Sequence, residues 1–135
     1  MKKNELPRGL RNNNPLNIRK NSDVFQGEVV PSRDTAFKQF KTMAYGYRAG
    51  FKILSNYFRV YRLTTIRQMV SRWAPENENN TSAYVSLVAS YSRIGPDDPL
   101  KFDREHMIPI VAGMSRVENG READMPEVIT GWNLL

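Results

Sequence analysis

The stretch IPIVAGMSRVENG, Ile108–Gly120, decides the expected fold. Its apolar side chains recur at intervals of three and four residues, which is the spacing of one face of an α-helix. These side chains are Ile110, Val111, Met114 and Val117. The pattern ends at Gly120, and glycine readily takes the left-handed conformation with which helices often terminate. The stretch therefore predicts a helix that buries one face in a core and stops at Gly120.

Glu118 is the chemically notable residue of this stretch. It falls in the predicted last turn, where unpaired backbone carbonyl groups make the potential negative and Lys or Arg is the more favourable residue. A carboxyl group at that end, among apolar neighbours, is expected to keep its proton more strongly than a solvated one, as a general acid must. The alternative interpretation is a solvated glutamate at a frayed helix end.

The composition limits the class of protein. The chain has 135 residues, of which 40% are hydrophobic and 10% aromatic, as expected of one folded globular domain. It has no cysteine and one histidine, so disulfides and thiolate zinc sites are excluded and no metal or cofactor is expected. No apolar run reaches the length of a membrane helix, and the N-terminal MKKNELPRGL lacks the apolar core of a secretory signal. We therefore expect neither membrane insertion nor signal-directed export.

The charge favours an anionic partner. The net charge is +6 and the isoelectric point is about 9.8, and nucleic acid or an anionic bacterial cell wall would both be attracted at long range. The basic residues are spread along the chain without a basic block or a nucleic-acid-binding motif. Nucleic acid is therefore the less favoured partner.

The chain divides into a short leader and one domain of the α+β class, mostly α. Residues 1–10 are expected to be a flexible leader, because Pro7 and Gly9 interrupt a polar stretch. Residues 11–40 alternate turn residues with short apolar stretches, which predicts a small N-terminal β-lobe with a strand over 24–30. Residues 41–135 carry apolar residues at helical spacing, which predicts a helical lobe. Its helices are expected at about 42–61, 65–73, 81–93, 103–118 and 126–135.

Polar residues of the β-lobe are candidates for a binding cleft. Asn13, Asn14 and Asn17 lie in a loop that cannot be regular helix, and asparagine side chains suit the hydroxyl and amide groups of sugars. Glu28 and Asp34 are acids that could face a catalytic acid across a cleft. The alternative is that the asparagines satisfy the backbone of their own loop and that the two acids lie on the surface.

Three short motifs resemble enzymes that cleave the bacterial cell wall. NTSAYVSLV at residues 80–88 resembles the Glu-Thr-Arg-x-Tyr-Val-x-x-Val motif of lytic transglycosylases, in which the tyrosine, matched by Tyr84, lies beside the catalytic glutamate. Val117–Gly120 resembles the Glu-Ser-Gly or Glu-Gly signature at the end of the catalytic helix of lysozyme-like enzymes. NNPLNIR at residues 13–19 is similar to a segment of bacterial glucosaminidases. The resemblance implies a lysozyme-like fold.

Nearly the whole chain also resembles a group of phage and prophage proteins. That group is marked by RNNNPxNIR near the start and RWAPxxENxT in the middle, and Arg11–Arg19 and Arg72–Thr81 carry these marks. Its members are often labelled virion structural proteins. The resemblance implies synthesis in the bacterial cytoplasm, followed by association with other virion proteins or release to the cell wall.

The order of the motifs departs from that of lysozyme-like enzymes. There the glutamate helix precedes the β-lobe and the tyrosine helix, whereas here the β-lobe comes first and Glu118 lies near the end. A circular permutation would reconcile the two orders, because site geometry can persist when chain order changes. The hypothesis predicts that Glu118 and Tyr84 lie within a few ångströms of each other and face the lobe of residues 12–40.

Three functions remain open at this point. The first is a glycosidase that cleaves peptidoglycan glycan strands, with Glu118 as general acid, Tyr84 as its positioning partner, and either a second carboxylate (Glu28 or Asp34) or the substrate's own groups completing the reaction. In it, Asn13, Asn14 and Asn17 would bind substrate. The second is a non-catalytic virion structural or cell-wall-binding protein that keeps the fold. The third, supported by charge alone, is a nucleic-acid binder.

Overall fold

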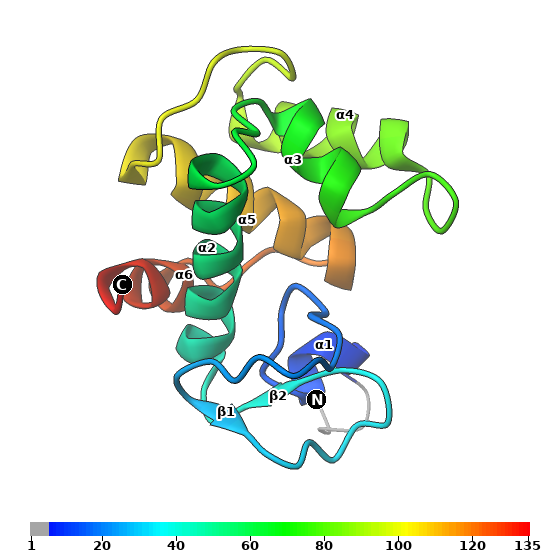
Figure 1. The fold of residues 1–135 in the computed structure, drawn as a ribbon, viewed down its shortest axis with the longest axis vertical. Coiled ribbons are helices and arrows are strands. Elements are labelled where there is room, and N and C mark those ends of the chain that lie inside the picture. The colour runs from blue at the N-terminus through cyan, green and yellow to red at the C-terminus, as the bar shows by residue number, and fades with distance from the viewer. Residues whose placement is uncertain (1–5) are drawn as a thin grey trace.

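Most of the helices pack together above a small, irregular N-terminal lobe (Figure 1). The computed structural model describes residues 6–135. The helices are α1 Arg8–Arg11, α2 Met43–Arg59, α3 Ile66–Trp73, α4 Thr81–Ser92, α5 Arg104–Asn119 and α6 Met125–Asn133, and the strands are β1 Glu28–Val29 and β2 Gln39–Phe40. The two strands pair antiparallel, with Glu28 opposite Phe40. The described chain is therefore mostly helical with one small sheet, which confirms the expected α+β class.

The helix starts lie where capping residues place them. The side chain before each of the five longer helices accepts a hydrogen bond from a backbone N–H at the third residue of that helix, which satisfies a donor that the helix itself leaves free. The capping residues are Thr42, Thr65, Asn80, Asp103 and Asp124. At the other end of α5, Gly120 has φ of 69° and caps the helix in the left-handed conformation, as predicted.

Helix α2 forms the centre of the core. Its buried face carries Tyr47, Phe51 and Leu54, which belong to one apolar cluster with residues of α5 and α6. Trp132 of α6 meets the ring of Phe51 edge-on, with centroids 5.2 Å apart. Gly131 permits this close packing, because a Cβ there would lie 2.8 Å from the backbone oxygen of Ala44 in α2. The apolar stripes at helical spacing are thus core, and they hold α2, α5 and α6 as one body.

The N-terminal lobe has less regular sheet than the sequence predicts. Instead of a strand over 24–30, two residues of β1 pair with β2, and Arg19 and Phe37 form an isolated bridge. Gly27, with φ of 80°, turns the chain within the predicted strand. Side-chain hydrogen bonds link the lobe where backbone pairing between strands is absent. Buried Lys38 donates to the Glu28 carboxylate at 3.1 Å and to the backbone oxygen of Asp23 at 2.7 Å.

The prediction of a flexible leader over residues 1–10 is wrong for residues 8–10. Residues 1–5 of the expected leader lie outside the described part of the chain. Residues 8–11 form α1, which packs against α5, and Gly9 is buried there. A Cβ at Gly9 would meet three oxygens within 3 Å, including Asn17 Oδ1 at 2.7 Å, so glycine at this position allows α1 to dock on the lobe. In the part of the chain that is described, no helix is both long and apolar enough to span a bilayer.

Lys38 is expected to be the most sensitive polar residue of the lobe. Its side chain is fully buried and that of Glu28 is 7% exposed, so removing the cation leaves a buried carboxylate unpaired. Lys38→Met should lower the free energy of unfolding by about 3 kcal/mol, measured by urea denaturation. The double variant Lys38→Met/Glu28→Gln should lose clearly less than the sum of the two single variants. Additive losses would show that the pair is not coupled.

Candidate functional site

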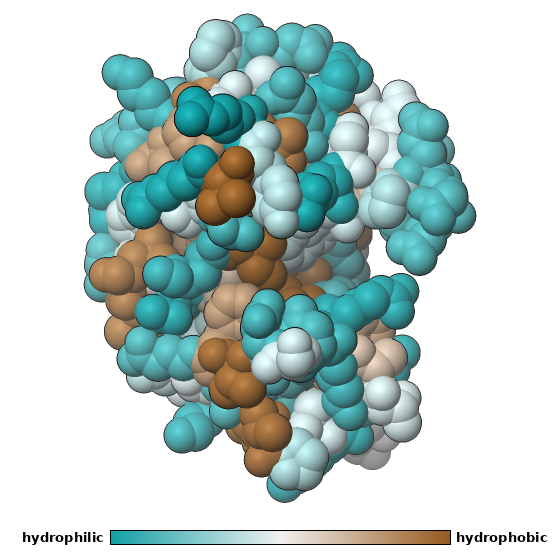
Figure 2. Space-filling model, viewed as in Figure 1, coloured by the Kyte–Doolittle hydropathy of each residue, from teal (hydrophilic) through white to brown (hydrophobic). Residues whose placement is uncertain are grey.

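A groove separates the N-terminal lobe from the upper helices. Its volume is about 840 Å³, and the outline of the molecule is indented where the lobe meets the α3–α4 region (Figure 2). One wall is residues 16–25 of the lobe together with Phe37, the second is the exposed face of α2, and the third is the stretch 72–79 after and within α3. Glu118, at the end of α5, lines the same groove. The two stretches that mark the resemblance to phage proteins therefore contribute to facing parts of one surface.

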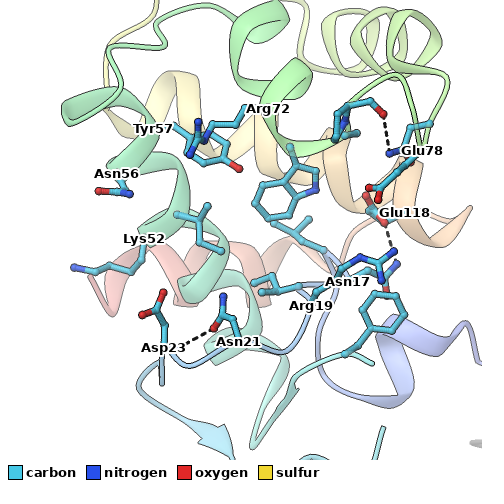
Figure 3. Close-up of a pocket in the computed structure, with 18 of the residues that line it drawn as sticks. Asn17, Arg19, Asn21, Asp23, Lys52, Asn56, Tyr57, Arg72, Glu78 and Glu118 are labelled. Atoms are coloured by element: carbon cyan, nitrogen blue, oxygen red, sulfur yellow. Dashed lines mark hydrogen bonds between the residues drawn. The ribbon is translucent and has the colours of Figure 1, made fainter. Parts of the chain in front are cut away.

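Glu118 is held by two donors from different parts of the chain. Its Oε2 accepts a hydrogen bond from the Tyr84 hydroxyl of α4 at 2.9 Å, and its Oε1 accepts one from Nδ2 of Asn17 in the lobe, also at 2.9 Å. The side chain is half-buried and lines the groove beside Asn17 (Figure 3). The expected proximity of Glu118 and Tyr84, facing the N-terminal lobe, is confirmed. The carboxyl group is thus fixed in orientation at both oxygens.

Tyr84 is a buried donor. Its exposed fraction is 6%. Burial, together with the charge of the neighbouring Glu118 carboxylate and its hydrogen bond, holds the pKa of the Tyr84 phenol well above its ordinary value. The hydroxyl therefore stays protonated at physiological pH and continues to donate to Glu118.

Asn17 occupies an unusual conformation that serves the same contact. Its φ is 53°, in the left-handed region that asparagine tolerates better than most residues. Its Nδ2 binds Glu118, while its Oδ1 is buried without a hydrogen-bond partner. A buried amide oxygen without a partner is unfavourable, so the contact with Glu118 is made at a local cost in stability. Such costs are often found at functional sites.

The other two asparagines shape the loop. Asn14 is fully buried, and its Nδ2 donates to the backbone oxygens of Ile18 and Lys38 at 2.9 Å each. Asn13 has φ of 52° and donates to the backbone oxygens of Phe40 and Lys41. Neither lines the groove. Of the three candidate binding residues, only Asn17 contacts Glu118. Asn13 and Asn14 instead bind backbone groups of the lobe, as the alternative interpretation of these asparagines predicts.

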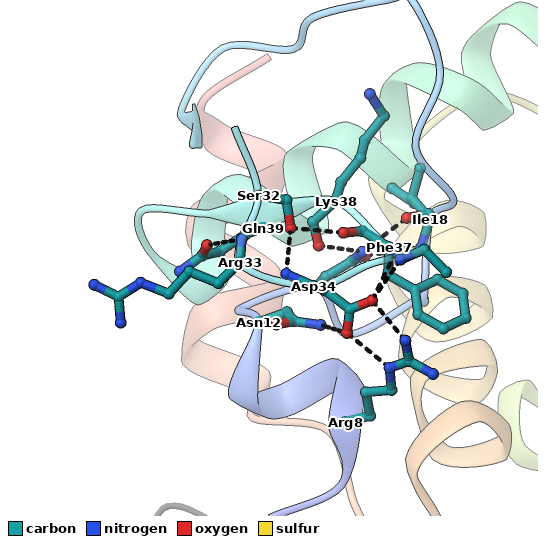
Figure 4. Close-up of polar contacts among 11 residues, drawn as sticks. Arg8, Asn12, Ile18, Ser32, Arg33, Asp34, Phe37, Lys38 and Gln39 are labelled. Carbon is teal, nitrogen blue, oxygen red and sulfur yellow. Dashed lines mark hydrogen bonds and ion pairs between the residues drawn. The ribbon is translucent and has the colours of Figure 1, made fainter. Parts of the chain in front are cut away.

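Glu28 and Asp34 do not face Glu118, which corrects the expectation of a second acid from this pair. The Glu28 carboxylate forms an ion pair with the ammonium group of Lys38. Asp34 accepts two hydrogen bonds from the Arg8 guanidinium at 2.6 and 2.7 Å and a third from Asn12 (Figure 4). It also accepts from the backbone N–H groups of residues 36 and 37. Both carboxylates are therefore parts of the lobe's scaffold, and neither lines the groove.

Several groove residues were not singled out from the sequence. Aromatic and amide side chains both line the walls: the rings are Phe25, Phe37, Tyr57 and Trp73, and the amides include Asn21, Asn56 and Asn79. Two further carboxylates, those of Asp23 and Glu78, also line it. At helical spacing Tyr57 and Trp73 look like core residues, and both are indeed half-buried. The position of Trp73 in the RWAPxxENxT motif is the sequence feature that could have identified it as a groove residue.

The groove can support acid–base chemistry on a polar polymer. Aromatic faces pack against the apolar faces of sugar rings, and amides offer both donors and acceptors to hydroxyl and acetamido groups. Among residues 6–135, no group of three or more His, Asp or Glu side chains is placed to bind a metal ion. The chemistry available here is that of a carboxyl group with fixed orientation in an open groove.

Comparison with known proteins places the chain among phage proteins. It is 42% identical over 120 residues to "Protein P5" of Pseudoalteromonas phage PM2, an alignment that covers 87% of this chain and 74% of that protein. No protein-family model matches the chain. The expected kinship with phage proteins is confirmed, and the relative's name specifies no activity.

The Arg8–Asp34 contact predicts a pH dependence of stability. The hydrogen bonds from Arg8, reinforced by those from Asn12 and the backbone, hold the pKa of Asp34 well below its ordinary range. A carboxyl with a lower pKa in the folded than in the unfolded state stabilises the fold above its unfolded pKa, and this stabilisation is lost as the pH falls below about 4. Wild type should therefore lose stability more steeply than Asp34→Asn between about pH 5 and pH 2. Parallel curves in urea denaturation would contradict this assignment.

Proposed function

This chain belongs to the family of Protein P5 of Pseudoalteromonas phage PM2, and on that premise we propose that it is a peptidoglycan glycosidase of the lysozyme or lytic transglycosylase kind. The proposal includes a lysozyme-like fold in circularly permuted order. The observation that carries it is the Glu118 carboxylate, fixed between Tyr84 and Asn17 in a groove lined by aromatic and amide side chains.

In the proposed reaction, Glu118 acts first as an acid and then as a base. It gives its proton to the glycosidic oxygen of the leaving sugar, the bond to the anomeric carbon breaks, and positive charge develops on the remaining ring. Tyr84 and Asn17 then stabilise the carboxylate that Glu118 becomes, because each donates a hydrogen bond to one of its oxygens. In the second step Glu118 takes a proton from the incoming nucleophile.

The nucleophile in this proposal is a group of the substrate itself. Glu28 and Asp34 lie outside the groove. The two other carboxylates that line it, those of Asp23 and Glu78, are on exposed residues, and their oxygens accept no hydrogen bond in the described part of the chain. A protein nucleophile must be held close to the anomeric carbon, so a loosely held carboxylate suits the role poorly. Attack by a substrate hydroxyl, with its proton passing to Glu118, would release a glycan end that lacks one water.

A second candidate is a cell-wall-binding virion protein without catalysis. It is supported by the kinship with a phage protein and by the absence of a second firmly held carboxylate among the groove residues that the structure describes. The same aromatic and amide side chains would then bind glycan without cleaving it. The two candidates differ in what Glu118 does.

Replacing Glu118 separates the two candidates. Wild type should clear a suspension of purified cell walls, and Glu118→Gln should slow clearing by about 10²- to 10⁴-fold, the usual contribution of a general acid. Glu122→Gln is the matched control, because Glu122 lies on the same part of the chain, is exposed and does not line the groove. No clearing by wild type, with retained sedimentation on insoluble peptidoglycan, would instead establish the binding protein.

The positioning of Glu118 is tested through its phenol partner. Tyr84→Phe removes one hydrogen bond to a charged group, worth about 1.5–3 kcal/mol, so cleavage should slow by about 10- to 100-fold. The Michaelis constant should change little, because Tyr84 is buried behind Glu118 rather than among the groove-lining residues. Tyr91→Phe is the control, since its hydroxyl binds Glu122 away from the groove. An equal effect of both variants would argue against a specific role for Tyr84.

A further inference from the structure

The groove carries three basic side chains that have no acidic partner. Arg19, Lys52 and Arg72 line it, and none of them lies within 4.0 Å of a carboxylate in the described chain. By contrast, the buried Lys38, which does not line the groove, is paired with Glu28 at 3.1 Å. These three cations line the groove together with the carboxylates of Asp23, Glu78 and Glu118, and each cation remains available to pair with an anionic group of a ligand.

Arg72 makes the closest ring contact of these three cations. Its guanidinium carbon lies 3.8 Å from the ring centroid of Tyr61 and 5.3 Å from that of Tyr57. Contact with two rings restrains the guanidinium. Its N–H donors have no carboxylate within 4.0 Å in the described chain. A carboxylate matches the edge of a guanidinium with two parallel hydrogen bonds.

Side chains of α2 line the groove between Arg72 and the N-terminal lobe. Lys52 and Asn56 lie one turn apart on the same face of α2, and Tyr57 follows them (Figure 3). Lys52 is exposed and forms no ion pair. The wall formed by Lys52, Asn56, Tyr57 and Arg72 thus combines two positive charges with an amide and a ring, and Glu118 lies in the same groove.

We infer that this wall binds carboxylate groups carried on the glycan, so that the protein selects strands substituted with acidic peptides over neutral strands. The inference rests on the proposed function and specifies its substrate. Arg72 pairs with one carboxylate through its guanidinium edge, and Lys52 attracts a second as a point charge. The sugar rings of the same strand lie along the aromatic and amide side chains near Glu118.

The test uses full-length Glu118→Gln, which should bind without cleaving. Its sedimentation with insoluble peptidoglycan is compared with sedimentation on chitin, a neutral polymer of N-acetylated sugar, and binding to peptidoglycan should be at least about tenfold tighter. Adding Arg72→Met should weaken binding to peptidoglycan by about tenfold or more and leave chitin binding unchanged. Arg72→Lys should restore part of the loss, since it keeps the charge but not the planar edge.

Arg59→Met is the matched control. Arg59 also stacks on a ring, with its guanidinium carbon 5.6 Å from the centroid of Phe102, but it does not line the groove. Equal losses from Arg59→Met and Arg72→Met would overturn the inference, because they would reveal a general charge effect. Equal binding to the two polymers, with cell walls still cleared by wild type, would overturn the inference and leave the proposed function standing. Binding to neither polymer, with no clearing, would overturn both.

Discussion

The contact on which the site depends is the pair of hydrogen bonds that the Glu118 carboxylate accepts from Tyr84 and Asn17. It joins three segments that are far apart along the chain: the N-terminal lobe, α4 and the end of α5. Each donor is itself held by its surroundings. Tyr84 is buried in the core of the helical part, and Asn17 is held by a loop whose backbone is tied by Asn14.

The lobe is built to present that loop. With two residues in each strand, it cannot rely on a sheet for stability, and polar side chains carry out that function instead. Lys38 with Glu28 and Arg8 with Asp34 fix its turns from inside and outside, and Gly9 allows α1 to approach Asn17 and Asn119 closely. These interactions explain why two acids that resemble catalytic candidates in the sequence are structural residues in the fold.

Much of the fold could be predicted because its signals are local. The apolar spacing from Ile108 onward, the capping side chains and Gly120 place the helices within a few residues, and the contact between Tyr84 and Glu118 followed from motif resemblance. The roles of Glu28, Asp34, Asn13 and Asn14 could not be predicted, because they depend on partners such as Lys38 and Arg8 that are distant in sequence. The groove walls could not be predicted either. Tyr57 and Trp73 have the helical spacing of core residues, and the sequence does not show that other parts of the chain cover them only partly.

In the proposed reaction, Glu118 transfers a proton to a glycosidic oxygen in this groove. Mass spectrometry of the soluble sugars that wild type and Glu118→Gln release from purified peptidoglycan tests this proton transfer. The proposed chemistry predicts new glycan ends that lack one water, formed by wild type and not by the variant. Intact glycan strands after incubation with folded wild-type protein would contradict it.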